Sequence, residues 1–315
     1  MDRMEIRSRL DEALSKNKVL VMSHRGVVGA NIVDNTVEAF EAALQGGADM
    51  LEMDVCASTD GELFVIHDGT EPMLFGSERN VTTMTASEIR SLRFLNKHRT
   101  CIEHAPNTFD EILEHLRGRT VINLDRCWNI WPAVLEKVKD HHMEDQVLLK
   151  SPCAQKYIDY LDACETKFMY DPFIMEPEEL DLLKGKDVNL VCVQIDAYHE
   201  GDADMEPAFL HGLEEQGICR SICAMTLGYP YSRETMEGII RRWSDEKTSE
   251  TRAKIERRIR DGGQRPANGR DDDRSVLGDP DGGWGWLIER GFNVLMTDWP
   301  VQMAAYLRQK GLKKA

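Results

Sequence analysis

The residues best suited to chemistry lie between Ser23 and Asp68. This stretch contains two histidines, His24 and His67, a single arginine, Arg25, and two carboxylates spaced two apart, Glu52 and Asp54. Few reactions other than metal-assisted attack on a phosphate ester use acids, bases, a guanidinium group and paired carboxylates together. We therefore expect this stretch to carry a phosphoester site, provided that the surrounding elements bring the residues to one place.

Glu52 and Asp54 lie on a predicted strand over residues 50–55. Residues two apart on a strand share a face, so both carboxylates point the same way while the apolar residues between them point outward. Carboxylates directed into a core are costly unless they pair with cations or bind a metal. The spacing alone leaves both an inward ion pair with Lys or Arg and a metal site open.

Asp125 is a candidate third oxygen ligand, because it ends the predicted strand Ile-Asn-Leu-Asp. Three carboxylates without a His/Cys cluster suit a hard cation such as Mg²⁺ or Ca²⁺ better than zinc. The alternative is that Asp125 caps a following helix.

His24 and His67 each fall where a predicted strand ends. Two histidines at one mouth could divide the acid and base roles of a phosphoryl transfer. A single histidine is more often structural, and the neighbouring Arg25 and Asp68 are what favour a chemical role here.

Arg25 offers a planar fork for phosphate oxygens, although an ion pair with Glu52 or Asp54 is the alternative. Lys150, at the end of a later predicted strand, could add a second positive charge, and its alternative is a solvated strand-end lysine. We expect Gly26 to let the backbone pass close to a ligand.

Strand-like and helix-like patterns alternate along nearly the whole chain. This alternation predicts a parallel sheet in the α/β class, and eight such units predict a closed (β/α)₈ TIM barrel. The predicted strands cover 19–23, 50–55 with an extension over 63–66, 121–125, 147–150, 168–170, 190–195, 218–225 and 294–297. The predicted helices cover 36–45, 108–116, 132–139, 154–163, 178–183, 205–216 and 301–308.

Two segments interrupt this alternation within what we expect to be a single domain over residues 1–315. Residues 69–107 form a short excursion after the second strand, and residues 228–283 form a long helix–loop insertion before the last strand. Both follow strands, so in a barrel both lie on the C-terminal face, where substrates bind. Whether the longer segment covers the site as a lid or is a tolerated surface insertion stays open.

Bulk properties exclude several classes of function. The net charge of −16 repels nucleic acid and anionic membranes, so a phosphate-bearing substrate would need a local positive site. No apolar run is long enough to span a bilayer, and the N-terminus is a charged amphipathic stretch rather than a signal peptide. The eight cysteines are scattered singly, which predicts reduced, mostly buried thiols in a cytoplasmic protein.

Several of these motifs resemble the glycerophosphodiester phosphodiesterase family. They are Ser-His-Arg-Gly at 23–26, Asp-Asn-Thr-Val-Glu-Ala-Phe at 34–40, Gly-Ala-Asp-Met-Leu-Glu-Met-Asp-Val at 47–55 and Ile-His-Asp at 66–68. Gly-Phe-Asn-Val-Leu-Met-Thr-Asp-Trp-Pro at 291–300 is similar to the closing strand of that family. The resemblance spans residues 19 to about 310 and is most specific near its start.

This resemblance implies a (β/α)₈ barrel that hydrolyses glycerophosphodiesters, or related small phosphodiesters, to an alcohol and glycerol phosphate. It implies a divalent cation, Mg²⁺ or Ca²⁺ with Mn²⁺ as a further option. Carried over by position, His24 and His67 become the acid–base pair, Arg25 the phosphate ligand, and Glu52 and Asp54 metal ligands. The glycerol hydroxyl could attack first, giving a cyclic phosphate that water then opens.

The chain departs from the family pattern at three relevant positions. Asp34 and Asp125 stand where the family has glutamates, and Cys127 replaces a lysine for which Lys150 is the candidate substitute. An altered substrate is therefore expected. The alternatives are a lysophospholipase D or a lyase that releases a cyclic phosphate, and, from another class, an inactive phosphoester-binding protein. The sequence does not set the head group or the oligomeric state.

Overall fold

The computed structural model describes residues 2–196, 201–225 and 269–314. Most of the predicted insertion at 228–283 therefore lies outside the described residues, and only its last part, 269–283, can be compared with the prediction.

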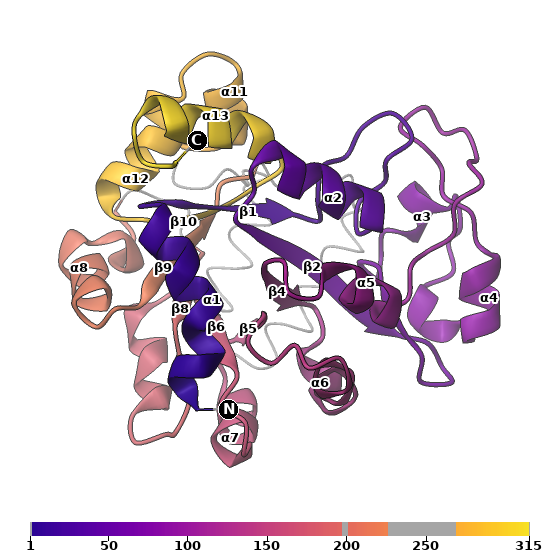
Figure 1. Ribbon diagram of the computed structural model, residues 1–315, viewed down its shortest axis with the longest axis horizontal. Helices are drawn as coiled ribbons and strands as arrows, with labels where there is room; N and C mark the ends of the chain where they lie inside the picture. The colour runs from indigo at the N-terminus through magenta and orange to yellow at the C-terminus, as the bar shows by residue number, and fades with distance from the viewer. Residues whose placement is uncertain (1, 197–200, 226–268, 315) are drawn as a thin grey trace.

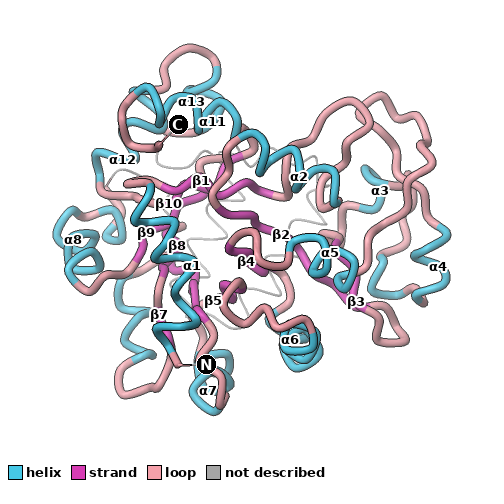
Figure 2. Tube along the Cα trace, viewed as in Figure 1, coloured by secondary structure: helices cyan, strands magenta, loops and turns pink. Residues whose placement is uncertain are grey.

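Eight parallel strands close into a barrel, which confirms the predicted fold (Figure 2). The first strand, β1, pairs in parallel with both the second barrel strand and the last, and these two pairings close the ring. The barrel strands are β1 (Leu20–His24), β2 (Met50–Ala57), β4 (Val121–Asp125), β5 (Val147–Pro152), β6 (Met169–Ile174), β8 (Cys192–Ile195), β9 (Cys219–Cys223) and β10 (Val294–Thr297). Two short strands lie outside the ring, β3 (Leu63–Val65) antiparallel to β2 and β7 (Asn189–Leu190) beside β6.

Side chains of the barrel strands alternate between the interior and the surrounding helices. On β2, the apolar Leu51, Met53 and Val55 belong to the core shared with the outer helices, while Met50 belongs to a separate cluster inside the barrel. Glu52 and Asp54 share the face of Met50, so both carboxylates point inward, as the spacing predicts.

Helices surround this sheet and bury their apolar faces against it (Figure 1). The longer ones are α2 (Val37–Gly46), α5 (Phe109–Leu116), α6 (Trp131–Asp140), α7 (Gln155–Ala163), α8 (Pro207–Glu215) and α13 (Pro300–Gln309). Their ends carry local sequence signals. The Thr36 hydroxyl caps α2 by accepting from the Ala39 N–H, and Thr108 and Glu111 form a capping box on α5.

One predicted helix has a different form. Residues 178–183 form part of the 3₁₀ helix η3 (Pro177–Leu183) rather than an α-helix. None of its residues is fully buried, so little apolar packing supports a longer regular helix at this position.

The N-terminal helix α1 (Arg3–Lys16) closes one end of the barrel. Its Ile6 and Leu10 are almost completely buried among interior side chains of the strands, including Leu20, Met22 and Met50. Figure 1 views the molecule from this end, with α1 crossing in front of the strands. Because α1 covers the amino ends of the strands, the polar interior opens toward their carboxyl ends.

Residues 69–107 contain the short helices α3 (Glu71–Leu74), η1 (Val81–Thr83) and α4 (Ala86–Ser91). Their apolar side chains pack with Phe64 and Ile66 into a small core of their own beside β3. This segment therefore forms a packed lobe, at the right of Figure 1.

The remaining short elements lie mostly between barrel strands. They are η2 (Trp128–Ile130), η4 (Ala203–Met205), α11 (Asp272–Val276), the π-helical turn η6 (Asp281–Gly285) and α12 (Trp286–Arg290).

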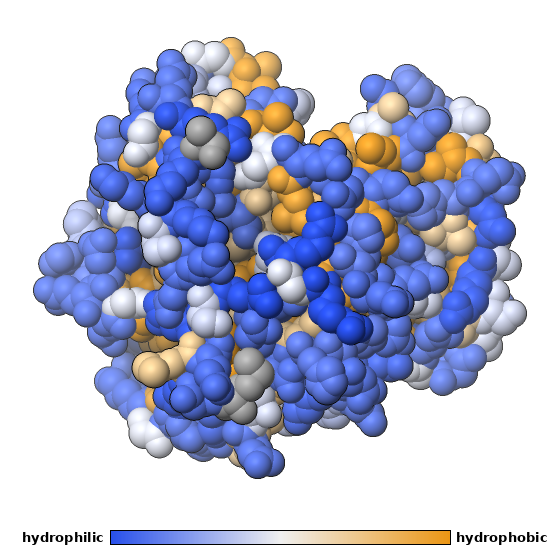
Figure 3. Space-filling view, in the orientation of Figure 1, coloured by the Kyte–Doolittle hydropathy of each residue, from blue (hydrophilic) through white to orange (hydrophobic). Residues whose placement is uncertain are grey.

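The surface is largely hydrophilic on the face seen in Figure 3, as expected from the net charge of −16. None of the described helices is long and apolar enough to cross a membrane. All eight cysteines are free thiols and six of them are buried, which confirms the prediction of mostly buried thiols.

Candidate active site

Three carboxylates meet inside the barrel near the carboxyl ends of neighbouring strands. Glu52 and Asp54 come from β2 and Asp125 from β4, and one oxygen of each lies within 4.8 Å of the others. Asp54 and Asp125 are paired in register, which explains why residues 71 positions apart meet. Asp125 is not a helix cap, because its carboxylate accepts instead from the N–H of Arg126 at 2.7 Å.

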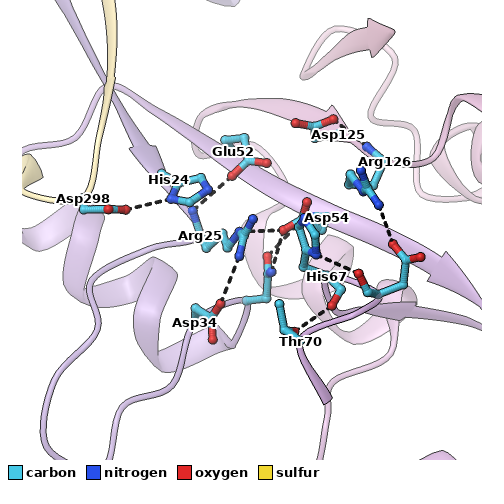
Figure 4. A network of polar contacts seen from close by, with 12 residues as sticks. His24, Arg25, Asp34, Glu52, Asp54, His67, Thr70, Asp125, Arg126 and Asp298 are labelled. Carbon is cyan, nitrogen blue, oxygen red and sulfur yellow. Dashed lines mark hydrogen bonds and ion pairs between the residues drawn. The ribbon is translucent and has the colours of Figure 1, made fainter. Parts of the chain in front are cut away.

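Two cations contact this carboxylate cluster. The Arg25 Nε lies 2.7 Å from Asp54 Oδ2, and another guanidinium nitrogen lies 3.6 Å from Asp34 Oδ2 (Figure 4). Lys150 Nζ lies 2.6 Å from Asp125 Oδ2 and is almost completely buried, so it is not a solvated lysine. The ion pair that the sequence offered as the alternative for Arg25 therefore exists, and it coexists with the three-carboxylate cluster.

The cluster has the properties of a site for a divalent cation. Asp54 Oδ1 is buried and has no hydrogen-bond partner in the described part of the chain. Burial, together with the charges of Asp54 and Asp125, raises the pKa of Glu52 well above its usual range. A hard cation that prefers oxygen ligands would relieve both the unpaired oxygen and the repulsion, so the residues present fit such an ion.

His24 ends β1 and is buried at the same mouth. Its Nδ1 lies 2.7 Å from Asp298 Oδ1, on the segment that follows β10. Because β10 is the neighbour of β1 in the closed ring, the last barrel strand brings this aspartate to the first. Burial alone would raise the pKa of Asp298, but His24 lowers it below its ordinary value.

His67 lies just beyond β3 and is held by a different kind of partner. Its Nδ1 is 2.9 Å from the backbone oxygen of Asp68, and the Thr70 hydroxyl donates to the His67 carbonyl at 2.6 Å. A carbonyl can only accept, so this contact places the hydrogen on Nδ1 and makes Nε2 the unprotonated nitrogen when the ring is neutral. Burial, and then the charges of Arg25 and Arg126, hold the pKa of His67 well below its ordinary value.

Left-handed backbone after β1 directs Arg25 into the site. Arg25 has a φ of 55° and Gly26 a φ of 87°. The close approach at Gly26 is to helix α2 rather than to a ligand-facing surface, because a Cβ there would lie 2.5 Å from the backbone of Ala39. The glycine is therefore required by the packing of α2, and the expectation that it also lets the backbone pass close to a ligand stays a prediction.

Sequence reasoning missed three residues of the site, Asp298, Asn35 and Arg126. The Asn35 amide donates to Asp54 Oδ2 at 3.0 Å. Asp298 could have been found from its place after the closing strand, since that strand must adjoin β1. Arg126 could not, because strict alternation after Asp125 would direct it outward.

Arg126 reaches the site through a left-handed turn with a φ of 64°. One of its guanidinium nitrogens lies 3.0 Å from Asp68 Oδ1. The same turn ends β4 and places Cys127 in the outer apolar core, away from the mouth. Cys127, at the family's lysine position, thus lies outside the site, while the neighbouring Arg126 brings a positive charge toward the site.

Comparison with known proteins gives a family and a fold for the chain. The profile of the glycerophosphoryl diester phosphodiesterase family matches residues 24–218. A glycerophosphodiester phosphodiesterase of Caldanaerobacter subterraneus subsp. tengcongensis is 32% identical over 145 residues, which cover 42% of this chain and 58% of that relative. The matched region thus spans less than two thirds of that relative's length.

Solved structures give the same fold over nearly the whole chain. A glycerophosphoryl diester phosphodiesterase from Parabacteroides distasonis superposes with a TM-score of 0.69 at 15% identity, covering 96% of this chain and 92% of that one. A phosphodiesterase from Oleispira antarctica, solved with the product sn-glycerol-3-phosphate, superposes with a TM-score of 0.60 at 15% identity, covering 94% and 99%.

Fold and site together define a TIM-barrel protein with a carboxylate cluster and two buried histidines at the carboxyl ends of its strands. The chain belongs to the glycerophosphoryl diester phosphodiesterase family.

Proposed function

We propose that this protein hydrolyses glycerophosphodiesters, or closely related phosphodiesters, to an alcohol and glycerol phosphate with the help of a divalent cation. The observation that carries the proposal is the meeting of His24, His67, Arg25 and the three carboxylates at one mouth of the barrel. The names of the relatives and the product bound to the Oleispira antarctica neighbour support the same substrate class.

Glu52, Asp54 and Asp125 would hold the cation. When bound, a divalent ion supplies Lewis-acid polarisation of a phosphoryl oxygen and lowers the pKa of an attacking hydroxyl or water. Mg²⁺, Ca²⁺ and Mn²⁺ are the candidates, because all accept oxygen ligands.

We assign the base role to His67. Its Nδ1 donates to the Asp68 carbonyl, so its Nε2 presents a lone pair, and its low pKa keeps the ring neutral near pH 7. In this role Nε2 takes the proton of the attacking glycerol hydroxyl or water as the new P–O bond forms.

We assign the acid role to His24. The carboxylate of Asp298 accepts the hydrogen on Nδ1, so a protonated His24 carries its second hydrogen on Nε2, from which it can be donated. That hydrogen passes to the leaving alcohol oxygen as the old P–O bond breaks. The donated hydrogen leaves with the alcohol, so His67 then gives its proton to solvent and His24 takes one up, which restores the starting state. If the glycerol hydroxyl attacks first, His24 instead takes the proton of the water that opens the cyclic phosphate, and His67 returns its proton to the glycerol oxygen.

Arg25 and Arg126 are the proposed phosphate-binding groups. The charge of Arg25 acts on both His67 and Asp298, which is consistent with a place between the acid and the base. Lys150 is bound to Asp125, so we propose that it balances charge beneath the cluster and that Arg126 takes the place of the family's lysine. We therefore keep Lys150 as a cation of the site, but we no longer propose that it binds the phosphate in place of the family's lysine.

The inactive alternative loses its main support at this site. It depended on the substitutions at Asp125 and Cys127, yet Asp125 still meets Glu52 and Asp54, and Arg126 still supplies a cation nearby. The shorter Asp34 still faces Arg25. We also keep a small-molecule substrate and a cytoplasmic location as part of the proposal.

A metal-by-substrate screen tests the proposal. The 315-residue chain is stripped with chelator, reloaded with Mg²⁺, Ca²⁺ or Mn²⁺, and offered glycerophosphodiesters of several head groups and a lysophospholipid. Phosphorus NMR identifies the product. We expect glycerol phosphate to form only after metal is restored. A persistent cyclic phosphate would favour the lyase alternative, and no turnover with any combination would contradict the proposal.

A further inference from the structure

A second buried carboxylate, Asp272, lies outside the site just described. It belongs to the short helix α11 and is 1% exposed. Its Oδ1 accepts from Trp284 Nε1 at 2.7 Å, and its Oδ2 accepts from the backbone N–H of Asp298 at 2.9 Å. The Thr297 hydroxyl lies 2.8 Å from both oxygens. A buried carboxylate with this many donors is fixed in position.

These contacts bear directly on the partner of His24. The Asp298 side chain is 47% exposed, so surrounding packing does not hold its carboxylate against the histidine. Its backbone is held instead, because Asp272 binds both the Asp298 N–H and the neighbouring Thr297 hydroxyl. That hydroxyl also accepts from the Trp299 N–H at 2.9 Å, which fixes the turn on the other side of Asp298.

Asp272 is also tied to the adjacent strand. Its own N–H donates to the Ala224 carbonyl at 2.7 Å, and the Ala224 N–H donates to the Met296 carbonyl at 2.8 Å. Asp272 therefore joins the ends of β9 and β10, and its carboxylate sets where the segment after β10 leaves the barrel.

We propose that Asp272 is a positioning residue for the acid half of the site, holding the Thr297–Asp298 backbone so that the Asp298 carboxylate stays on Nδ1 of His24. The inference rests on the proposed acid role of His24. Asp272 does not touch the reacting atoms and acts through Asp298.

The substitution Asp272→Asn tests this role with almost no change in side-chain shape. An amide offers one acceptor oxygen. It therefore cannot accept from both the Trp284 indole N–H and the Asp298 backbone N–H with separate oxygens, as the carboxylate does. We expect the Asp298 carboxylate to move away from His24. Two readouts follow this movement, the proton NMR resonance of the hydrogen-bonded His24 Nδ1–H and the dependence of turnover on the leaving group.

The His24 Nδ1–H resonance is expected to move upfield in Asp272→Asn, in the same direction as in Asp298→Asn, because the charge-assisted hydrogen bond to Asp298 is weakened. Turnover of a glycerophosphodiester with an alkyl leaving group is expected to fall about tenfold or more, because that oxygen needs a proton. Turnover of a p-nitrophenyl phosphodiester, whose leaving group needs no proton, is expected to change far less. A general loss of folded protein would lower both rates equally.

Ser275→Ala is the matched control in the same helix. The Ser275 hydroxyl accepts from the backbone N–H of Trp284 and donates to the Asp271 carbonyl, and neither of these hydrogen bonds involves Thr297 or Asp298. It should leave the His24 Nδ1–H resonance and the ratio of the two rates unchanged. If Asp272→Asn does not fold, Thr297→Val removes the hydroxyl instead and should shift this resonance in the same direction.

An unchanged His24 Nδ1–H resonance in a folded Asp272→Asn or Thr297→Val protein overturns the inference, as does an equal loss of both rates. A shifted His24 Nδ1–H resonance in a protein that turns over neither substrate would support the positioning role and count against the proposed function. The two claims can therefore fail separately.

Discussion

At the scale of single residues, charge balance decides what the site can bind. Three carboxylates, Glu52, Asp54 and Asp125, meet two paired cations, Arg25 and Lys150, which leaves one negative charge when all are ionised. A divalent cation would change this balance to one positive charge, suited to a phosphodiester anion. Without such an ion, the raised pKa of Glu52 means that a proton takes part of this role.

The first prediction concerns the ligand that joins β4 to the cluster. Asp125→Asn removes one charge and one oxygen ligand, so we expect metal affinity to fall at least about tenfold. Isothermal titration with Mn²⁺ measures this. Asp110→Asn, on the outer face of α5, is the control and should bind as the native protein does. Equal affinities in Asp125→Asn and native protein would remove Asp125 from the ligand set.

The second prediction concerns the arginine that sequence patterns did not indicate. Arg126→Met should raise KM for a glycerophosphodiester by roughly 10-fold or more, because a charge-assisted contact to phosphate is lost. Arg126→Lys keeps the charge but loses the planar guanidinium fork, so its KM should lie between those of the native protein and Arg126→Met. If kcat alone changes and KM does not, Arg126 acts by holding Asp68 and the neighbouring His67 rather than by binding phosphate.

At the scale of elements, the ends of the strands decide which side chains reach the mouth. Arg25 and Arg126 each follow the last residue of a barrel strand, and both have left-handed backbone. A left-handed residue interrupts strand alternation, so a side chain that would point outward is redirected. The packing of α2 against Gly26 fixes the turn that carries Arg25.

The third prediction tests that packing. Gly26→Ala places a methyl group 2.5 Å from the Ala39 backbone at a φ of 87°, so we expect a loss of at least about 2 kcal/mol in the free energy of unfolding. Gly61→Ala is a matched control, because its φ is 89° but no atom lies within 4 Å of the added Cβ. It should lose only about 1 kcal/mol from backbone strain. Equal losses in a denaturant titration would show that the contact with α2 contributes nothing.

The ends of the strands also explain which features of the structure could be predicted from the sequence and which could not. Alternating patterns predicted the eight strands, and the spacing of Glu52 and Asp54 predicted their inward direction, because both depend on local periodicity. The pairing of His24 with Asp298 depends on closure of the ring, which brings together residues 274 positions apart. The direction of Arg126 depends on one left-handed φ at a non-glycine residue, for which sequence gives no reliable signal.

At the scale of the whole molecule, the barrel carries buried carboxylates away from the site as well as within it. Asp204, in η4, is 1% exposed, and neither of its oxygens has a hydrogen-bond partner within the described ranges. Burial, then the charges of Asp202 and Asp196, raise the pKa of Asp204 to about 8. Ionising this group in the folded protein is therefore unfavourable.

The fourth prediction follows from this shift. The folded protein holds the Asp204 proton up to about pH 8, whereas the unfolded chain releases it near its ordinary pKa of 3.8. The contribution of Asp204 to stability is thus fully present below about pH 4 and is lost as the pH rises to about 8.

Asp204→Asn stays neutral, so it should remove this dependence and be more stable than the native protein at pH 9 by on the order of 3 kcal/mol. Denaturant titrations between pH 4 and pH 9 measure the effect, with the exposed Asp11→Asn as the control. A native protein and an Asp204→Asn variant with parallel pH profiles would contradict the shift.

The central claim is that two histidines at one mouth of the barrel divide the acid and base roles of phosphodiester hydrolysis. The most direct test is kcat/KM for a glycerophosphodiester in metal-loaded native protein, His24→Ala and His67→Ala, with the exposed surface variant His211→Ala as the control. We expect each of the two site variants to lose roughly 10²-fold or more and His211→Ala to match the native protein. Near-native turnover in either His24→Ala or His67→Ala, with the protein folded, would contradict the account.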